Sequence, residues 1–182
     1  MSFHFIKIQD IRENDIYGGY NIILEAKLEN IIDRISIDIA TGDPITPGAT
    51  PYKYCTLIDN KELDMKSYNY ETILAEKIQT ILSRSILNSR SKDFYDVYII
   101  YKLKWDEIDV LLLKEAFAKT CEYRNTLFDK YETEKILSLL HDNKDMNSRW
   151  KIYSKKNAFA NDLTYEDIIE VIKKAIVYLY VE

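Results

Sequence analysis

The chain has 182 residues, of which 47% are hydrophobic and 30% are charged, so it is long enough to form one folded domain or a small domain with a helical appendage. Its net charge of −5 excludes a general positive field for nucleic acid and leaves that role to a local basic patch. It has no long apolar stretch and no basic segment followed by an apolar run, so we expect neither a membrane span nor a secretion signal, and a cytoplasmic location.

The cysteines and histidines are too few and too scattered to predict a metal centre. Cys55 and Cys121 are far apart and form no CxxC motif, and neither His4 nor His141 is near a cysteine. We therefore expect both cysteines to be reduced, buried thiols.

Residues 3–66 have the pattern of β-structure. Strands are predicted at Phe3–Ile8 and Tyr20–Leu28, with a turn between them that contains Gly18 and Gly19. No helix signal follows the glycine pair, so the pair indicates a turn rather than a phosphate-binding loop.

The clearest strand covers Arg34–Ala40, where the residue types alternate. Its isoleucines share one face, which we expect to be packed, and its polar residues share the other (Ile35, Ile37 and Ile39; Arg34, Ser36 and Asp38). Asp38 is thus a mid-strand carboxylate on the open face. It is either a metal ligand or a surface aspartate beside Arg34.

The remaining β-structure follows a loop. Residues 41–48 contain two prolines and two glycines and predict turns, Tyr52–Ile58 alternates as a strand, and Asp59–Lys61 has the composition of a hairpin turn. Together these segments predict a small antiparallel or mixed sheet of about four or five strands.

After about Ser67 the apolar period changes to that of a helix. Helices are predicted at Glu71–Asn88, Asp93–Lys104, from Asp106 to about Cys121, Tyr131–His141, Asn147–Ala160 and Thr164–Tyr180. Asp106 is the expected N-cap of the third helix, and the last helix begins with the capping pattern Thr-x-x-Asp. The sequence thus predicts an α+β protein, in which residues 1–68 form a β-rich sheet and residues 69–182 a helical bundle.

The run from Tyr70 to Lys102 concentrates charge on two successive helices. The first helix carries Lys77 and Arg84, the link carries Arg90 and Lys92, and the second helix carries Asp93 and Asp96. One interpretation is a solvated polar face with ordinary pairing between successive helical turns. The other is a functional site, which requires these charges to converge.

The order and spacing of these residues resemble the AbiEii/AbiGii toxin family. The resemblance lies in ETILAEK (71–77), Arg84 and RSKDFYDVY (90–98), and extends to IDIATGDPITP (37–47) and RWKIYSKKNAFANDLTYEDII (149–169). Proteins of this family are nucleotidyltransferase-like toxins of abortive infection (phage defence) and type IV toxin–antitoxin systems. The resemblance covers nearly the whole chain.

The resemblance implies a partial nucleotidyltransferase-type mixed sheet followed by a helical bundle, and a transferase reaction in which an NTP gives a nucleotide to RNA such as tRNA. It implies that Mg²⁺ and NTP serve the intact family enzyme. The resemblance also implies roles for individual residues. The catalytic residues would be Lys77, Asp93 and Asp96, and the nucleotide-binding residues Lys77, Arg84, Arg90 and Lys92. Asp38 would bind the metal.

The sequence departs from the family upstream of Asp38. The family has a glycine–serine turn and an acidic DxD pair there, whereas Asp10, Asp15 and Asp33 have the wrong spacing for such a pair. We therefore expect this chain to be inactive or nearly inactive alone, and it is open whether it binds any cofactor. An incomplete sheet also exposes an edge, which predicts self-association or docking of a partner.

Two alternatives to a transferase remain. The chain is either a non-catalytic module that binds an antitoxin or nucleic acid, or a helical interaction protein without a nucleotide site. Divergence of Lys77, Asp93 and Asp96 in space would support the second alternative.

The segment 149–156 is the densest basic patch, and it interleaves aromatic residues with cations (Arg149, Lys151, Lys155 and Lys156; Trp150 and Tyr153). Such a patch can stack bases and contact phosphates. The alternative is an amphipathic helix whose Trp150 and Tyr153 pack on the bundle.

Overall fold

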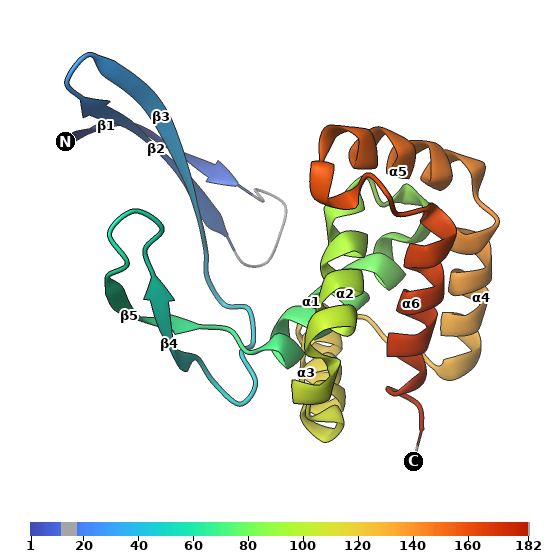
Figure 1. Ribbon diagram of the computed structural model, residues 1–182. Coiled ribbons are helices and arrows are strands. Elements are labelled where there is room, and N and C mark those ends of the chain that lie inside the picture. Colours follow the sequence, from blue (N-terminus) through green and yellow to red (C-terminus); the bar gives the residue numbers. More distant parts are fainter. Residues whose placement is uncertain (12–17, 182) are drawn as a thin grey trace. The chain divides into compact units, whose positions relative to one another are not determined.

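The computed structural model describes residues 1–11 and 18–181 and divides the chain into two compact units, Met1–Asp43 and Pro44–Glu182 (Figure 1). The secondary structure changes from strands to helices later, between β5 (Glu62–Ser67) and α1 (Tyr70–Arg84). Asp15 and the start of the predicted turn at residues 17–20 lie outside the described residues.

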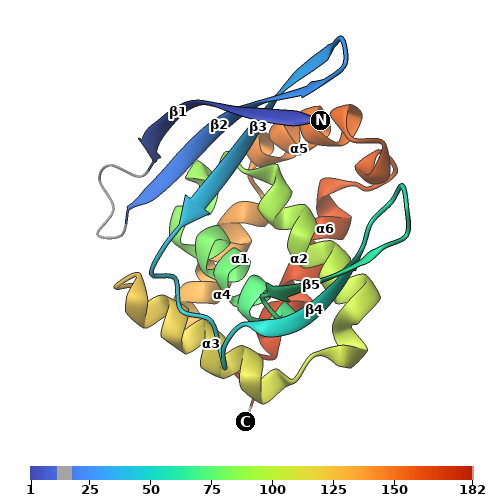
Figure 2. The same ribbon diagram turned by 90° about the vertical axis from the view of Figure 1, so that its left-hand side faces the viewer.

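The first unit is a three-stranded antiparallel sheet in the order β1-β2-β3 (Figure 2). Its strands are β1 (Ser2–Ile11), β2 (Gly19–Leu28) and β3 (Ile31–Ala40), which confirms the three predicted strands. Gly19 pairs with Ala40, and a Cβ on Gly19 would lie 2.9 Å from the backbone oxygen of Ile39. The glycine is therefore needed for close approach of the two strands.

The apolar face of this sheet is exposed, contrary to the prediction from the isoleucines of β3. The register places Ile35, Ile37 and Ile39 opposite Leu24, Ile22 and Tyr20, so apolar side chains line one face as expected. However, Ile35, Ile37 and Ile39 are 37%, 42% and 41% exposed. A single antiparallel sheet has no second layer of its own to cover that face.

The second unit begins with a loop and a separate hairpin of β4 (Thr50–Cys55) and β5. Its turn is closed by the backbone N–H of Thr56, which donates to Lys61 O at 2.9 Å. The α+β class is confirmed, but the strands form two antiparallel sheets where the sequence predicted one sheet. The loop that contains Pro44 and Pro47 separates β3 from β4, and proline cannot donate to a sheet ladder.

Between residues 70 and 181, which the structure describes without a gap, the bundle contains six α-helices, joined in three places by 3₁₀ turns. The helices are α1, α2 (Ser91–Lys104), α3 (Val110–Tyr123), α4 (Lys130–His141), α5 (Lys144–Lys156) and α6 (Tyr165–Val177), and the 3₁₀ turns are Ser85–Leu87, Trp105–Glu107 and Ala158–Ala160. All six predicted helices are thus confirmed, with their ends shifted by a few residues.

The cap of α3 differs from the prediction. Asp106 lies in a 3₁₀ turn, and the N-cap is Asp109, whose carboxylate accepts hydrogen bonds from the backbone N–H groups of Leu111 and Leu112. Glu71 fixes this start, because its Oε1 accepts from the backbone N–H of Asp109 at 2.9 Å. Capping patterns in the sequence describe only neighbouring residues, so they could not predict this contact between Glu71 and Asp109, which are 38 residues apart.

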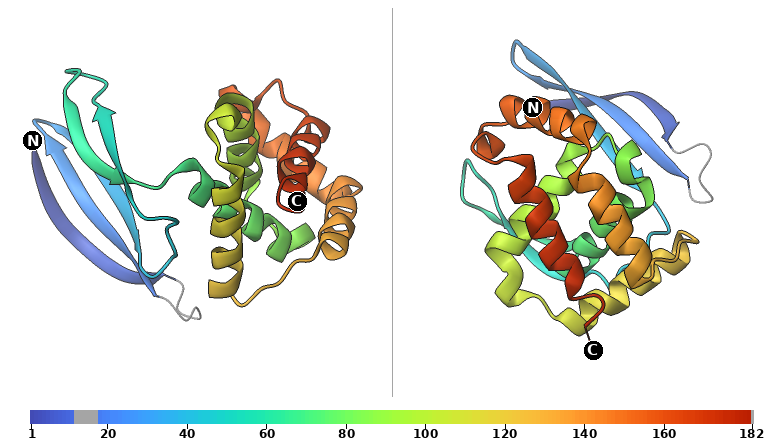
Figure 3. Two further views of the ribbon diagram at one scale, coloured as in Figure 1. Left: turned by 90° about the horizontal axis from the view of Figure 1, so that it is seen from below. Right: turned by 90° about the vertical axis from the view of Figure 1, so that its right-hand side faces the viewer.

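The core lies where α1, α2, α3 and α6 meet. α1 packs against α2 and α3, and α6 packs against α2 and α4 (Figure 3). Fully buried residues from the first, second and last helices fill this core, among them Leu74, Ile78, Val97 and Ile172. The core therefore fixes the two helices that carry the predicted charge cluster.

Helix α5 has the amphipathic structure predicted by the second interpretation of its basic patch. Trp150 is 2% exposed, and its indole N–H donates to Leu163 O at 2.8 Å, so the ring is unavailable for stacking on a base. Tyr153 packs on Trp150 with ring centroids 5.4 Å apart.

Neither cysteine forms a disulfide, and they differ in exposure. Cys121 is buried, and burial raises the pKa of its thiol, whereas Cys55 is exposed, which corrects the prediction that both are buried. No helix within residues 1–11 and 18–181 combines the length and apolar character that a bilayer crossing requires.

The capping box at the start of α6 gives a test of the bundle. Thr164 Oγ1 accepts from the backbone N–H of Asp167, and the Asp167 carboxylate accepts from the backbone N–H of Thr164 at 2.9 Å. We expect Thr164→Ala to lower the free energy of unfolding by about 1 kcal/mol, measured by chemical denaturation followed by circular dichroism at 222 nm. Thr164→Ser keeps the acceptor oxygen and is the control; equal losses in both variants would contradict this account.

Candidate functional site

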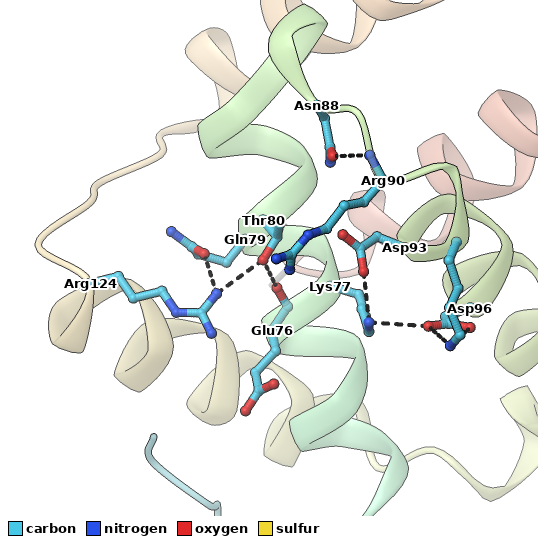
Figure 4. A network of polar contacts seen from close by, with 10 residues as sticks. Glu76, Lys77, Gln79, Thr80, Asn88, Arg90, Asp93, Asp96 and Arg124 are labelled. Carbon is cyan, nitrogen blue, oxygen red and sulfur yellow. Dashed lines mark hydrogen bonds and ion pairs between the residues drawn. The ribbon is translucent and has the colours of Figure 1, made fainter. Parts of the chain in front are cut away.

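Lys77 of α1 lies between two carboxylates of α2. Its Nζ is 2.7 Å from Asp93 Oδ1 and 3.1 Å from Asp96 Oδ2 (Figure 4). Asp93 and Asp96 are one helical turn apart, so both carboxylates reach the same side of α2. The structure thus brings together the three residues predicted to be catalytic, and the divergence that would have supported a helical interaction protein is not observed. Their catalytic role stays a prediction.

The three groups differ in their access to solvent. The side chain of Asp93 is 6% exposed, that of Asp96 is 17% and that of Lys77 is 26%. Burial alone would lower the pKa of Lys77, but the hydrogen bonds and negative charges of Asp93, and then of Asp96, outweigh it and hold this pKa above the ordinary value of 10.5. Lys77 is therefore a cation at neutral pH.

The ammonium group of Lys77 keeps capacity for a further contact. An ammonium has three N–H donors, and the two aspartates take two of them. Because the side chain is partly exposed, the third donor can meet an anion from solvent. The aspartates restrict where the ammonium group lies, so that anion would meet a cation that is already oriented.

The turn between α1 and α2 sets this geometry. The α1 helix ends at Arg84, and its C-cap Ser85, which has a φ of 46°, begins the Ser85–Leu87 3₁₀ turn. Asn88 Oδ1 then accepts from the backbone N–H of Arg90 at 2.9 Å, an Asx-type turn that leads into α2. The chain reverses here over a few residues, so the start of α2 lies beside the middle of α1.

A residue from α5 holds this turn in place. Arg149 Nη1 donates to Ile86 O at 3.2 Å and to Asn88 O at 3.1 Å. The sequence analysis assigned Arg149 to a basic patch and missed this role. No spacing rule could have identified it, because Arg149 lies 61 residues from Asn88 in the sequence.

The other predicted nucleotide-binding residues lie at different distances from Lys77. Lys92 Nζ lies 2.9 and 2.8 Å from the two oxygens of Asp96 and extends the network into solvent. Figure 4 shows the side chain of Arg90 pointing back over α1 toward Thr80. Arg84 is exposed at the end of α1. It is seven residues, or about 10 Å along the helix, from Lys77.

A second polar network borders the first on α1. Arg124, which follows α3, donates from Nη1 to Gln79 Oε1 at 2.7 Å and to Thr80 Oγ1 at 3.0 Å. Thr80 in turn donates to the backbone oxygen of Glu76. The sequence analysis missed Arg124, because a single arginine in an inter-helix segment has no pattern to distinguish it.

Two buried polar atoms near the turn have no hydrogen-bond partner among the described residues. They are Asp93 Oδ2 and Asn88 Nδ2, on residues that are 4% and 1% exposed. Unsatisfied buried groups of this kind are rare in native structures and often mark a site that binds a ligand or water. One acceptor and one donor are thus available beside the Lys77 cluster.

Asp38 lies on β3 in the first unit. Its Oδ1 accepts from Asn21 Nδ2 at 2.6 Å, and the same amide lies 2.6 Å from Ser36 Oγ. The three side chains share the polar face of the sheet, as the alternation predicted. The role of Asp38 as a metal ligand stays a prediction.

The residues near Lys77 do not by themselves fit a Mg²⁺ site. Asp93 and Asp96 are turned toward ammonium groups, and within the part of the chain that the structure describes no cluster of three or more histidine, cysteine, aspartate or glutamate side chains could hold a metal. A hard divalent cation needs several oxygen ligands. We therefore derive no step through a metal from these residues.

The comparison with protein families identifies the same region as part of a known group. The family model described as the nucleotidyl transferase AbiEii toxin of type IV toxin–antitoxin systems matches residues 2–171 of this chain. The chain belongs to the AbiEii family. This confirms the resemblance that the motifs of α1 and α2 indicated.

The AbiEii-family chain is also similar to a solved structure from H. pylori, a protein provisionally assigned as a nucleotidyltransferase. The match covers 97% of this chain and 65% of that one, with a TM-score of 0.47 and 14% sequence identity. The chain therefore spans less than two thirds of the length of that protein. A search of curated proteins gave no match.

The Lys77 cluster predicts a pH-dependent stability. In Lys77→Met the buried Asp93 carboxylate loses its cation, and we expect a loss of about 2 kcal/mol in the free energy of unfolding at pH 7, less than for a fully buried pair because Lys77 is partly exposed. The folded-state pKa of Lys77 lies above its ordinary value of 10.5, so its stabilisation is complete below pH 10.5 and is lost as the pH rises through the higher folded value.

The difference in the free energy of unfolding between the wild type and Lys77→Met, measured by urea denaturation, should therefore become smaller above pH 10.5. Tyrosines that titrate in the same range are present in both proteins and cancel in the difference. A difference in unfolding free energy that stays constant to pH 11.5, or that is absent at pH 7, would contradict the stabilising ion pairs between Lys77 and the two aspartates.

Proposed function

We propose that this chain supplies the triphosphate-binding and RNA-binding part of a nucleotidyltransferase toxin. In the reaction, a hydroxyl oxygen of RNA, such as a tRNA end, bonds to the α-phosphorus of an NTP, and the bond to the β-phosphate breaks to release pyrophosphate. The observation that carries the proposal is the ammonium of Lys77, held between Asp93 and Asp96 with one donor left. Membership of the AbiEii family supports the reaction class.

Each charged residue has a distinct part in this proposal. Lys77 contacts the triphosphate and stabilises negative charge that develops during transfer, because a preorganised cation needs little rearrangement. Asp93 and Asp96 orient Lys77. Arg90, Lys92 and Arg84 add positive charge along the path of the phosphates, and arginine is suited to bidentate phosphate contacts.

The proposal includes Mg²⁺ and NTP for the intact family enzyme, and little transfer by this chain alone. Both carboxylates nearest to Lys77 are engaged by ammonium groups, so neither offers a free pair of oxygens to a metal. Asp38 is the remaining candidate among the predicted site residues. Holding the attacking and leaving oxygens with two metals requires more carboxylates than these.

The test separates binding from transfer. Equilibrium dialysis with each radiolabelled NTP should give measurable binding that Lys77→Ala weakens at least about tenfold, the effect of one charged hydrogen bond. Lys135→Ala, on the exposed side of α4, is the matched control. NTP binding that is absent, or equal in the two variants, would contradict the proposed triphosphate site.

Incubation with labelled NTPs, Mg²⁺ and total tRNA then tests activity. We expect little incorporation by this chain. Strong incorporation that Lys77→Ala abolishes would support the transferase reaction and contradict the inactivity of the chain alone.

A second candidate function is a non-catalytic module that binds a partner. The exposed isoleucines of β3 favour it, because the edge strands β1 and β3 each leave one side unpaired in the described sheet and the apolar face beside them is open. The partner would be an antitoxin, as type IV systems imply, or a second copy of the chain.

Self-association is tested by size-exclusion chromatography with light scattering. We expect the wild type to form a dimer or larger species at high concentration, and Ile37→Ser to shift it toward the monomer. Arg34→Ser, on the polar face of the same strand, is the control. A monomeric wild type at high concentration would leave a heterologous partner as the occupant and contradict self-association.

A further inference from the structure

Four aromatic side chains form a surface on α2, α5 and the Ala158–Ala160 turn, which we call the aromatic platform (Tyr95, Tyr98, Tyr153 and Phe159). Phe159 is 61% exposed, although its ring centroid lies 4.8 Å from that of Tyr95 and 6.5 Å from that of Tyr153. The ring centroids of Tyr95 and Tyr98 lie 6.5 Å apart, with an angle of 29° between the ring planes. Phe159 thus presents a large ring to solvent on a support of other rings.

The platform adjoins the Lys77 cluster. Tyr95 and Asp96 are neighbours in α2, and α5 crosses near the start of α2 (Figure 1). The pKa of Tyr153 is raised, first by burial and then by the negative charge of Asp96. A polymer bound on the platform can therefore extend to the proposed transfer site.

Lysine side chains lie on the two helices that carry the platform. Lys151, Lys155 and Lys156 are exposed on α5 and form no ion pair with any residue that the structure describes. Lys92 is 70% exposed on α2, and Lys102 Nζ lies 5.8 Å from the centre of the Tyr98 ring. The protein as a whole is acidic, and Lys92 is paired with Asp96, so the local positive charge here comes mainly from the three α5 lysines, which pair with no described carboxylate.

We infer that this surface binds single-stranded RNA, with a base stacked on Phe159 and the backbone phosphates on the lysines of α5. Base stacking on aromatic rings beside cations is how proteins bind single strands without reading their sequence. The inference rests on the proposed function, because it identifies where the RNA acceptor would bind. The sequence interpretation offered Trp150 and Tyr153 as stacking residues; Trp150 is buried, and the exposed ring of this surface is that of Phe159.

The charge and the rings together favour RNA over an apolar partner. A protein partner that covered only the rings would leave the α5 lysines without counter-charges, whereas a single strand supplies one phosphate for each stacked base. Base stacking and phosphate contacts can be tested separately, because stacking requires bases whereas the lysines require only phosphates.

The test uses the full chain, without NTP or metal, and fluorescence anisotropy of two labelled 12-nucleotide RNAs, oligo(A) and an abasic strand of equal length. Phe159→Ala should weaken oligo(A) binding between about five- and one-hundred-fold, the range for stacking one base, and leave abasic binding unchanged. Phe159→Trp should restore oligo(A) binding. Tyr131→Ala, which removes a 77% exposed ring from α4, is the matched control.

The lysines are tested by salt dependence. Lys155→Gln with Lys156→Gln should reduce the slope of log K against log salt by about 1.4 for both strands, since each phosphate contact on a single strand contributes about 0.7. Lys130→Gln with Lys135→Gln, on α4, should leave the slope unchanged.

The platform is contradicted if oligo(A) does not bind, if Phe159→Ala has no effect, or if it weakens the two strands equally. These outcomes are distinguishable from failure of the proposed function. NTP binding that depends on Lys77 would persist without an RNA platform, and stacking on Phe159 would persist if Lys77 had no role.

Discussion

The rest of the structure depends on one constraint, the pairing of Lys77 with Asp93 and Asp96 across two helices. A nearly buried carboxylate such as Asp93 destabilises a fold unless a cation or hydrogen bonds compensate it. The position of Lys77 in the middle of α1 supplies that cation only if α2 starts beside it. The helix pair, the turn and the charge cluster are therefore parts of one arrangement.

This arrangement links the fold to the proposed chemistry. Arg149 holds the turn from α5, and α5 also carries the lysines beside the aromatic platform. One helix thus supports the turn beside the Lys77 cluster and carries part of the surface proposed to bind RNA. Hydrophobic replacements could fill the space of a buried ion pair without loss of stability, so the retained charge fits a functional site better than a stabilising device.

The sequence predicted the elements better than their contacts. Apolar period identified α1 and α2, and a capping pattern also marked the start of α6, because these signals are local. The convergence of Lys77 with Asp93 and Asp96 was only expected, because it depends on a turn that a distant arginine supports. The exposed face of β3 was not predicted, since alternation shows which side chains share a face and not whether anything covers it.

The most direct test of the account is NMR of the chain with its lysines labelled biosynthetically with ¹³C at Cε, which leaves the ammonium groups and their three N–H donors unmodified. Comparison with Lys77→Arg would assign the Lys77 signal. We predict that titration with an NTP, without Mg²⁺, shifts this signal and that the corresponding nucleoside, which lacks phosphates, does not. A Lys77 signal that stays unchanged at saturating NTP would contradict the account.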